Sequence, residues 1–575
     1  MTREWKILPE RDNAKLQNAF PSRLVRQLLL NRGIEDESAA QSFLSPDYAR
    51  DLHDPFLFQD MEKAAARVTR ALKDGEHIAI HGDYDADGVC ASAIIASTLE
   101  FLGGKPSVYL PHRMKDGYGL KQQAVDTIAA QGATLLITAD CGISNIDAIT
   151  SAQSRGIDTI IVDHHHAPPV LPAAYAIIHC DREGERYPFR HLSAGGVAFK
   201  FAQALLRTAR LTRLELTERN VEAFEKWLLD LVAISTVADV MPLIGENRAL
   251  VHYGLHVLRQ TKRPGLRMLI GRANSNRQYG NGDFTARTIG YQIAPRLNAA
   301  GRMEHASLAY DLLRADNEAD AARLAELLET ANSERQRVTD IMFEESIMQT
   351  GEGKSGTVMV TYGRDWSVGL VGLVAGKLAD RFGKPAFVIG AMNGSWIGSC
   401  RGDGVFDCVT ALESVADLLD HWGGHAQAAG FTLKEEIEPS QFAEVLQERN
   451  VAYAGIRPAL LIDAVAGFGE LDDAIVSMSS QLAPHGEGNP PVLLLTRGAL
   501  VTRASFVGKS ERHVKCALRD VAGIEKTAIA FGHADLDEPH LHEGARVDIV
   551  YEPAQNFWNG NSSLELYVRD TRKAE

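Results

Sequence analysis

Six ionisable side chains at the ends of three apolar segments are the residues in this chain best placed to do chemistry. The segments are short and rich in β-branched residues, so residues 78–80, 135–138 and 159–162 predict buried parallel strands. Ligands bind open α/β sheets at the carboxyl ends of strands, so side chains at these ends should converge in one crevice. The six are His81, Asp85, Asp87, Asp140, Asp163 and His164.

Carboxylates crowded into one crevice repel each other, and this repulsion raises their pKa values unless a cation is bound. A mixed set of aspartates and histidines suits Mn²⁺ or Mg²⁺ better than a closed structural zinc site. Asp85 and Asp87 are two residues apart, so in an extended segment they share a face and reach two neighbouring ions. A single aspartate after a strand is usually a cap or turn residue, but clusters that agree on one location favour a metal site.

Length and composition are those of a multidomain globular protein. The 575 residues allow three or four domains, with 45% hydrophobic and 23% charged residues. No apolar run reaches the length of a membrane span, and residues 1–6 lack the apolar core of a signal peptide. The six cysteines have no paired spacing, which is typical of reduced thiols. We therefore expect a cytoplasmic protein without membrane contact.

The net charge of −15 argues against bulk non-specific binding of nucleic acid, although it is compatible with a basic channel. One stretch, residues 503–526, is basic within this acidic chain. A local basic surface of this kind leaves room for a nucleic-acid partner.

The order of predicted elements divides the chain into five parts. Residues 1–70 are predicted to be helical. In residues 71–303, strands alternate with helices from about 76 to 182, which predicts a doubly wound parallel sheet, and a helical stretch follows. Residues 304–349 are highly charged and contain neither Pro nor Gly, which predicts a long helix bridging two domains. Residues 350–454 return to α/β patterning, and residues 455–575 hold short strands and turns that predict a small β-barrel.

The motifs taken together carry a family resemblance. Residues 81–88, with Asp163-His164-His165, resemble the DHH phosphoesterase superfamily, and from about residue 22 onward the chain is similar to the RecJ exonucleases within it. Supporting segments are 111–113, 117–119, 235–240, 294–302, 423–430, 511–515 and 561–564. The resemblance implies a DHH domain at 71–303, a linker helix, a DHH-associated domain at 350–454 and an OB-like barrel at 455–575. Ser367 and Gly402 depart from the family's usual His and Ser.

The resemblance also implies a ligand set for two ions. His81, Asp85 and Asp140 would hold one ion, and Asp87, Asp140, His164 and Asp239 the other, with Asp140 as the bridge. His165 would touch the scissile phosphate, and Asp163 would orient a histidine by accepting its ring N–H. Asp83 is a capping or supporting residue in this scheme. The reaction that follows is two-metal hydrolysis of a phosphodiester bond.

A second implied set of residues contacts DNA: Arg113, Tyr118, Arg296, Asn298, Arg302, Ser399, Arg401 and His425. Arg401 and Ser399 suggest an anion cradle, in a region that holds the 5′ phosphate in the family. Tyr118 is either a stacking platform for the terminal base or a turn aromatic. The glycines before His425 allow either a close phosphate or tight packing. In the barrel, stacking on single strands and core packing compete as explanations of Phe506, Phe531, Phe557 and Trp558.

The expected function is a single-stranded-DNA-specific 5′→3′ exonuclease that releases 5′-mononucleotides and acts in DNA repair and recombination. We expect a monomer whose partners are single-stranded DNA, a single-stranded-DNA-binding protein and recombination helicases. Two alternatives stay open. A small-substrate DHH phosphoesterase, of the oligoribonuclease or pyrophosphatase type, generally lacks the terminal barrel. A catalytically inactive DHH replication scaffold loses metal ligands. The chain has both the barrel segment and the ligands, which favours the exonuclease.

Overall fold

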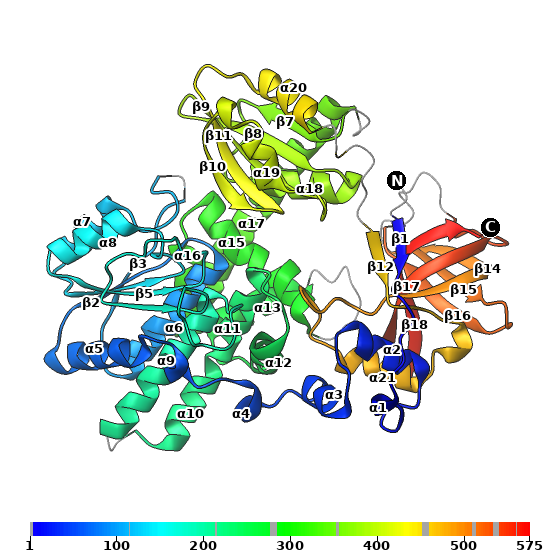
Figure 1. Ribbon diagram of the computed structural model, residues 1–575, viewed down its shortest axis with the longest axis horizontal. Helices are drawn as coiled ribbons and strands as arrows, with labels where there is room; N and C mark the ends of the chain where they lie inside the picture. The colour runs from blue at the N-terminus through cyan, green and yellow to red at the C-terminus, as the bar shows by residue number, and fades with distance from the viewer. Residues whose placement is uncertain are drawn as a thin grey trace. The chain divides into compact units, whose positions relative to one another are not determined.

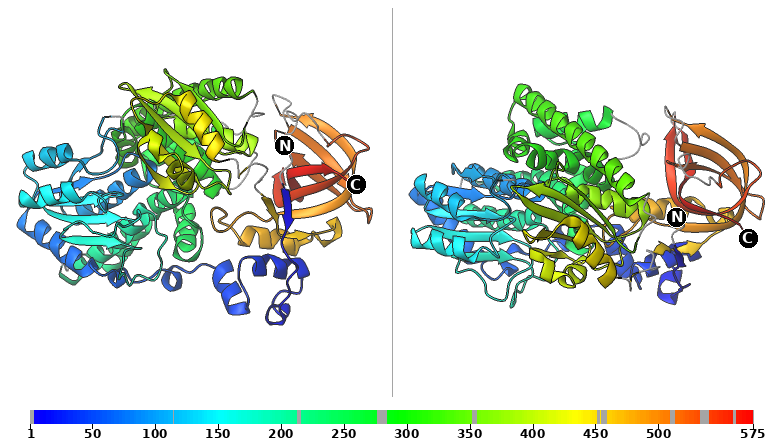
Figure 2. Two further views of the ribbon diagram at one scale, coloured as in Figure 1. Left: turned by 45° about the horizontal axis from the view of Figure 1, so that its top comes forward. Right: turned by 90° about the horizontal axis from the view of Figure 1, so that it is seen from above.

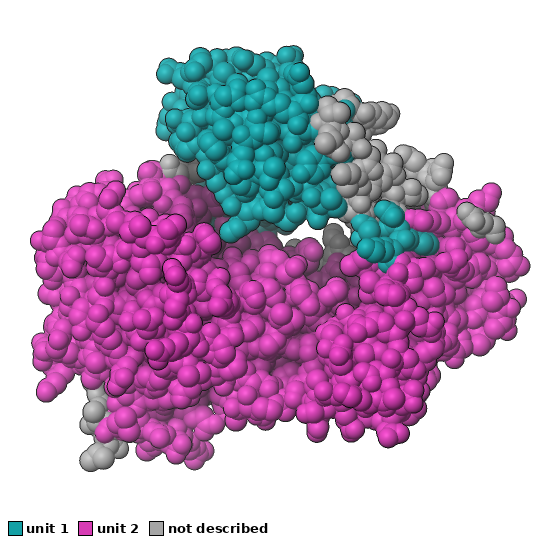
Figure 3. Space-filling model, viewed as in Figure 1, with its two compact units in different colours: residues 1–6, 299–305, 327–460 teal, residues 7–298, 306–326, 461–575 magenta. Residues whose placement is uncertain are grey.

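The computed structural model of the chain (Figure 1) divides into two compact units (Figure 3). The first unit contains residues 1–6, 299–305 and 327–460, and the second contains residues 7–298, 306–326 and 461–575. The structure describes all residues except 1–3, 114, 213–215, 276–283, 352–355, 451–452, 454–458, 509–512, 533–539, 559–560 and 575. Within that described part, no helix is long and apolar enough to cross a bilayer.

A five-stranded parallel sheet forms the first half of the second unit, which confirms the predicted doubly wound sheet. Its strands lie in the order β3-β2-β4-β5-β6, so the direction of sheet growth reverses between β2 and β4. This reversal is a topological switch point, the place where open α/β sheets bind ligands. The strands are β2 (Ile78–His81), β3 (Ser107–Tyr109), β4 (Leu135–Ala139), β5 (Asp158–Asp163) and β6 (Ala176–His179).

Helices cover both faces of this sheet (Figure 1). On one face, α7 and α8 share a buried core with alternate strand residues, among them Leu136 and Ile161. The opposite face carries α5, α6 and α9, and all strands except the edge strand β3 are buried on both sides as in other parallel sheets. These helices are α5 (Met61–Asp74), α6 (Ala86–Phe101), α7 (Gln122–Ala130), α8 (Ile146–Ser154) and α9 (Ala194–Thr212).

Further helices follow the sheet along the chain. The helix α11 is mostly apolar and is buried at every residue from Leu229 to Thr236, which is the pattern of a core helix. The bounds are α10 (Glu218–Trp227), α11 (Leu229–Ala238), α12 (Gly245–Arg259), α13 (Pro264–Ser275), α14 (Ala286–Thr288), the π-turn η2 (Ile289–Ile293), α15 (Ala294–Met303) and α16 (Ser307–Arg314).

A long helix, α17 (Glu318–Thr350), confirms the predicted helical run, but the run is not continuous from residue 304. The chain first forms α16 and then breaks. The side chain of Asn317 accepts a hydrogen bond from the backbone N–H of Asp320 at 2.9 Å, so it starts a new helix.

The first unit contains a mixed five-stranded sheet in the order β10-β11-β9-β8-β7. Only β7 and β8 pair in parallel, and the glycine-rich segment 423–430 forms the hairpin between β10 and β11. Its elements are β7 (Met359–Gly363), α18 (Val371–Phe382), β8 (Ala386–Met392), β9 (Ser395–Arg401), α19 (Cys408–Glu413), η3 (Ala416–Leu418), β10 (Leu419–His425), β11 (Ala428–Leu433) and α20 (Pro439–Arg449). The α/β patterning expected after residue 350 is present.

The C-terminal strands form a closed barrel, visible in both views of Figure 2. Pairing of β14 with β17 closes the ring β14-β15-β16-β18-β17, which confirms the predicted OB-like barrel. The elements are β12 (Ala459–Ile462), which pairs with β1 (Glu4–Ile7), then β13 (Ala464–Val465), η5 (Phe468–Glu470), α21 (Asp473–Gln481), β14 (Leu494–Val507), β15 (His513–Arg519), β16 (Glu525–Ala530), β17 (Arg546–Trp558) and β18 (Asn561–Lys573).

The N-terminal helices pack on the barrel. Leu24 and Leu28 of α2 belong to the same buried core as Leu494 and Tyr551 of the barrel strands. The N-terminal elements are α1 (Ala14–Gln17), α2 (Arg23–Asn31), α3 (Glu37–Leu44), α4 (Tyr48–Asp51) and the turn η1 (Pro55–Leu57). The first forty residues and the last hundred therefore fold around one core.

A buried arginine joins the sheet-bearing half of the second unit to the barrel. Arg248 of α12 is 3% exposed, and its guanidinium donates to the carbonyl oxygens of Phe43, Gln481, Leu482 and Ala483 over 2.8–3.0 Å. Its guanidinium carbon also lies 3.9 Å from the centroid of the Phe43 ring. A charged donor shared among four carbonyls is a strong tie between the two halves.

Candidate metal centre

The predicted ligands lie together at the carboxyl ends of three adjacent strands. His81 is the last residue of β2, Asp140 directly follows β4, and Asp163 is the last residue of β5, with His164 next in the chain. Because β2, β4 and β5 are neighbours in the sheet, these ends meet at one edge. The edge is the switch point, where the topology predicts a site.

Asp85 is a candidate metal ligand and also caps the start of α6. Its Oδ1 accepts hydrogen bonds from the backbone N–H groups of Asp87 at 2.9 Å and Gly88 at 3.1 Å, which caps the helix. A β-carbon on Gly88 would lie 2.7 Å from the backbone nitrogen of Asp83, so only glycine lets the preceding loop pack this closely. The glycine thereby keeps Asp83 and Asp85 beside the strand ends.

Asp140 owes its position to an unusual backbone conformation. Its φ angle is +66°, in the left-handed region that aspartate tolerates better than most residues. Its N–H donates to the carbonyl oxygen of Val162 at 3.0 Å, which ties the turn to β5. Gly142 follows with φ +114°, and a β-carbon there would lie 2.6 Å from Thr138 Oγ1. This tight turn places the Asp140 carboxylate between two groups of ligands.

The first group surrounds the imidazole of His164. Its Nε2 lies 3.3 Å from Asp140 Oδ1, 3.5 Å from Asp239 Oδ2 and 3.6 Å from Asp87 Oδ2. Asp87 is held in place by backbone N–H donation from Ala194 and Gly195, both at 2.9 Å. Oxygens of three carboxylates within 3.6 Å of one imidazole nitrogen are close enough together to bind one cation.

The second group consists of Asp83, Asp85 and Asp140, whose oxygens lie within 4.8 Å of one another. His81 does not fall within that distance of a group, but its ring Nδ1 lies 3.4 Å from Cys141 Sγ and its Nε2 is buried. Asp140 belongs to this group and also faces His164, as the bridging role requires. Asp83, expected only to support the site, is therefore also a candidate ligand.

Five polar atoms in this region are buried and have no hydrogen-bond partner: His81 Nε2, Asp83 Oδ1, Asp140 Oδ1, His164 Nε2 and Asp239 Oδ2. Leaving a buried polar atom without a partner is costly, and native proteins rarely tolerate it. Five such atoms at one sheet edge, all of them imidazole nitrogens or carboxylate oxygens, fit a pair of hard or borderline divalent cations.

The electrostatics of the site agree with this fit. Burial raises the pKa of the Asp140 carboxyl well above its usual value, and the charges of Asp87 and Asp85 raise it further. The pKa of Asp239 is raised by burial and by the same two charges. Burial lowers the pKa of His81 to about 4, so its ring is neutral, the form that binds metal ions. A bound cation would offset the repulsion among the carboxylates.

Asp163 holds the neighbouring site residues in place through hydrogen bonds. Its carboxylate accepts hydrogen bonds from the backbone N–H groups of Ile143 at 3.0 Å and His164 at 2.8 Å, and its Oδ1 lies 2.8 Å from Nδ1 of His165. Burial alone would raise the pKa of Asp163, but the bond and charge of His165 lower it to about 2. Asp163 in turn raises the pKa of His165 to about 9, against the effect of burial.

Three DNA-contact candidates of the second unit, Arg113, Tyr118 and Asn298, contact residues at this edge. The Tyr118 hydroxyl is 3.1 Å from His165 Nδ1, and the Arg113 guanidinium carbon is 4.9 Å from the centroid of the Tyr84 ring. Asn298 Oδ1 accepts from the N–H of Ala86 at 2.7 Å, and Arg296 is buried and donates to the Gln292 carbonyl. These bonds give Asn298 and Arg296 structural tasks, and their contact with DNA stays a prediction.

Of the candidates in the first unit, Ser399, Arg401 and His425 lie on its sheet, whereas Arg302 lies on α15. Arg401 Nη1 donates to Ser399 Oγ and to the Cys400 carbonyl, both at 2.8 Å, while His425 is exposed at the end of β10. Arg302 donates to the Gly369 carbonyl at 2.8 Å. At Gly402, a β-carbon would lie 2.7 Å from both Gln427 Oε1 and the Phe406 carbonyl oxygen, so this chain has no room for the family's serine.

Two barrel aromatics, Phe557 and Trp558, and the segment 509–512 lie outside the residues whose side chains the structure describes. Among those described, Phe506 is 62% exposed, whereas Phe531 packs edge-on against His513 and Tyr567. Exposure leaves Phe506 available to stack on a base, whereas ring packing explains Phe531.

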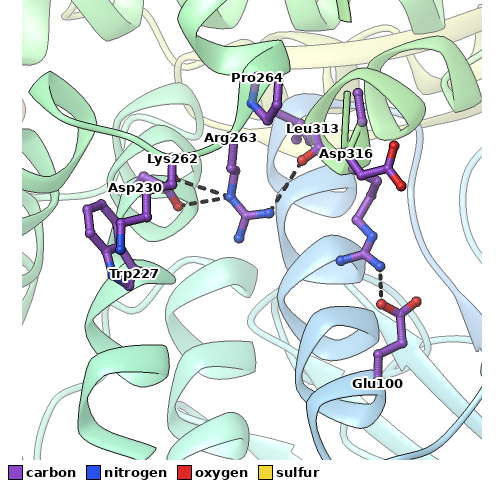
Figure 4. A pocket seen from close by; sticks show the side chains of 10 residues that line it. Glu100, Trp227, Asp230, Lys262, Arg263, Pro264, Leu313 and Asp316 are labelled. Atoms are coloured by element: carbon purple, nitrogen blue, oxygen red, sulfur yellow. Dashed lines mark hydrogen bonds and ion pairs between the residues drawn. The ribbon is translucent and has the colours of Figure 1, made fainter. Parts of the chain in front are cut away.

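A separate pocket of about 530 Å³ lies at the opposite end of α6 (Figure 4). The sixteen residues of α6 place it about 24 Å from the metal-ligand end of that helix. Its charged side chains already have partners: Arg263 pairs with Asp230 and Arg314 with Glu100, Lys262 lies over the Trp227 ring, and Asp316 accepts a hydrogen bond from the Asn317 side chain. None of the predicted site residues lines it.

Two residues that hold Asp87 in place, Ser235 and Gly195, were not predicted from the sequence. The Ser235 hydroxyl donates to Asp87 Oδ1 at 2.5 Å, and a β-carbon on Gly195 would lie 2.3 Å from Ser235 Oγ, so a glycine is required there. Ser235 lies in the segment 235–240 that carries Asp239, and this nearness is the signal that could have identified it.

The fold and site define a DHH-type phosphoesterase with an added OB-like barrel. Residues 77–236 match the DHH family, N-terminal domain, residues 355–452 match the DHHA1 domain, and residues 462–570 match the RecJ OB domain.

Relatives over almost the whole chain identify the family. The single-stranded-DNA-specific exonuclease RecJ of Bacillus subtilis is 35% identical over 99% of this chain and 71% of its own length. RecJ of Salmonella typhimurium is 33% identical over 97% of both chains. A crystal structure of RecJ from Thermus thermophilus with Mn²⁺ matches all of this chain and 80% of its own, with a TM-score of 0.81 and 27% identity. A second, with Mg²⁺, has a TM-score of 0.74 and 26% identity. The chain belongs to the RecJ family.

Proposed function

We propose that this chain is a single-stranded-DNA-specific exonuclease that hydrolyses phosphodiester bonds with two divalent cations, Mn²⁺ or Mg²⁺. The observation that carries the proposal is the set of five buried nitrogen and oxygen atoms without a hydrogen-bond partner at the switch point of the sheet. The donors suit these cations, and membership of the RecJ family supports DNA as the substrate.

The residues would divide between the two ions as follows. Asp87, His164 and Asp239 would hold one ion, Asp85 and His81 the other, with Asp83 as an additional oxygen donor and Asp140 shared by both. When bound, such a pair lowers the pKa of a bound water to near neutrality and stabilises negative charge on the phosphoryl group.

His165 and Asp163 would act as a unit on the scissile phosphate. Asp163 fixes the ring of His165 through the 2.8 Å contact and raises its pKa to about 9, so the imidazole is positively charged near neutral pH. A positive charge held in place, at a side chain that is 36% exposed, is suited to neutralise a phosphoryl oxygen. The Tyr118 hydroxyl lies beside the same ring and would restrict its rotation.

Polarity is the finer part of the proposal: removal of 5′-mononucleotides in the 5′→3′ direction. The support is the Arg401 cradle, in which Ser399 and the Cys400 carbonyl hold the guanidinium. A β-carbon on Gly372 would lie 2.9 Å from Arg401 Nη2, so the guanidinium packs closely against α18 at this glycine. A terminal phosphate has more charge and more free oxygens than an internal phosphodiester, so it binds an arginine better.

The barrel would bind the strand beyond the active site. The exposed Phe506 is suited to stack on a base, and stacking of this kind is independent of base identity. By resemblance alone, a single-stranded-DNA-binding protein and recombination helicases are the expected protein partners of a cytoplasmic monomer in repair and recombination.

The test is degradation of end-labelled strands by the full chain. Single-stranded, blunt duplex and 5′-tailed substrates are compared in Mn²⁺, in Mg²⁺ and in a chelator. We expect early release of a 5′ label as mononucleotide, no attack on blunt duplex and no hydrolysis in the chelator. Early release of a 3′ label would refute the polarity, and hydrolysis in the chelator would refute the metal centre.

A further inference from the structure

Tyr291 is the most exposed aromatic side chain among the described residues, at 75% exposure. It lies in the π-turn η2, whose end residues Ile289 and Ile293 are fully buried. These two apolar residues anchor the turn in the core while the ring between them faces solvent. Single π-turns within helices are rare and are found mostly at functional sites.

A cation lies beside this ring. The guanidinium carbon of Arg287 is 5.2 Å from the centroid of the Tyr291 ring, and Arg287 is exposed as well. An aromatic face with an arginine next to it offers both features that a single nucleic-acid strand requires, a surface for a base and a positive charge for its phosphate. Tyrosine also has few rotatable bonds, so little entropy is lost when it stacks.

The turn and the helix α15 that follows it contact two segments that carry candidate metal ligands. A β-carbon on Gly290 would lie 3.7 Å from Val237 Cγ1, so η2 packs on the end of α11, where Asp239 follows. Farther along the same helical segment, Asn298 accepts from the N–H of Ala86, between Asp85 and Asp87 in sequence. Val240, directly after Asp239, is 66% exposed and adds apolar surface at this place.

We propose that Tyr291, with Arg287 beside it, stacks on one base of the DNA strand close to the bond that is cut. The residue is a positioning residue, because holding one base sets which phosphate lies at the metal centre. The inference rests on the proposed exonuclease function and deepens it by naming where the strand is held.

The experiment uses a series of single strands, each with one abasic nucleotide at a successive position from the 5′ end. Full-length wild type should lose about 5- to 100-fold in kcat/KM at the one position where a base would meet Tyr291. Tyr291→Ala should show a similar loss on the intact strand and no further loss at that abasic position. Tyr291→Phe should restore the wild-type profile, because it keeps the ring.

The control is Phe56→Ala, since Phe56 is an aromatic with 40% exposure on the turn η1, which contains none of the predicted site residues. This variant should keep the positional profile of the wild type. The inference is overturned if Tyr291→Ala keeps the wild-type penalty at that one abasic position, or if it slows intact and abasic strands by the same factor. Absence of hydrolysis by the wild type would instead overturn the proposed function.

Discussion

Replacing Asp140 by asparagine should abolish hydrolysis and at the same time stabilise the metal-free protein. Asparagine has the same shape as aspartate and tolerates the φ of +66° found at this position, so the change removes charge without straining the backbone. Alanine would add a left-handed backbone cost of about 1–2 kcal/mol and would confuse the comparison.

The size of the effect follows from the spacing of the carboxylates. Oxygens of Asp83, Asp85 and Asp140 lie within 4.8 Å of one another, and two full charges at that separation repel by about 3.5 kcal/mol at an effective dielectric of 20. Burial and the charges of Asp87 and Asp85 raise the pKa of Asp140, so part of the repulsion is relieved by protonation. We therefore expect Asp140→Asn to gain roughly 1–3 kcal/mol in unfolding free energy without metal.

Divalent metal should reverse the order of stability. Mn²⁺ at a hundred times its dissociation constant should stabilise the wild type by about 2.7 kcal/mol. The variant lacks the ligand shared by both ions, so it should gain much less. Denaturant unfolding of both proteins, in chelator and in Mn²⁺, gives the four free energies that are compared.

The pH dependence has a defined sign. A carboxyl whose pKa is raised on folding destabilises the native state increasingly as the pH rises above its ordinary value of 3.8. The advantage of Asp140→Asn in chelator should therefore be present at neutral pH and vanish as the pH falls towards about 4. A variant no more stable than wild type in chelator at neutral pH, or one with near-wild-type hydrolysis, would refute the reasoning.

Arg401→Ala should reduce the preference for 5′-phosphorylated over 5′-hydroxyl strands by roughly tenfold, more than it reduces cleavage overall, as competition between the two substrates would measure. Arg248→Met should destabilise the fold by about 2–4 kcal/mol, because buried carbonyls lose their donor; thermal unfolding checks this, with Arg248→Lys as the milder control. Phe506→Ala should raise KM for long strands and leave short ones unaffected, in steady-state assays with strands of several lengths. Binding should weaken linearly on a logarithmic salt scale, and the slope reports how many phosphates are contacted.

The location of the site could be predicted from the sequence because its determinants are local. Short β-branched runs predict strands, their alternation with helices predicts a parallel sheet, and the carboxyl ends of such strands share an edge. His81, Asp140 and His164 each follow such a run closely, so their convergence needed no knowledge of distant contacts.

The contributions of Asp83 and Ser235 could not be predicted in the same way. Asp83 enters the ligand group because Gly88 allows a loop to approach α6, and Ser235 meets Asp87 across 148 residues of sequence. Such contacts depend on how closely two backbones approach, and a pattern of residue types does not contain that distance. The break at Asn317 within the charged helical run was also missed, because residue composition favours helix on both sides of it.

The boundaries drawn at 70 and 455 remain predictions, and the packing argues that they do not separate independent folding units. Residues of α2 share a core with the barrel, and Arg248 is held by carbonyls at residues 481–483. The Leu243 N–H, four residues after Asp239, donates to the Glu487 carbonyl at 2.7 Å. Removing residues 455–575 would therefore strip the N-terminal helices of their core and free the segment that follows a metal ligand. A loss of activity on truncation would then report on folding and on the metal centre as much as on DNA binding, so single surface changes such as Phe506→Ala are the sharper test of the barrel.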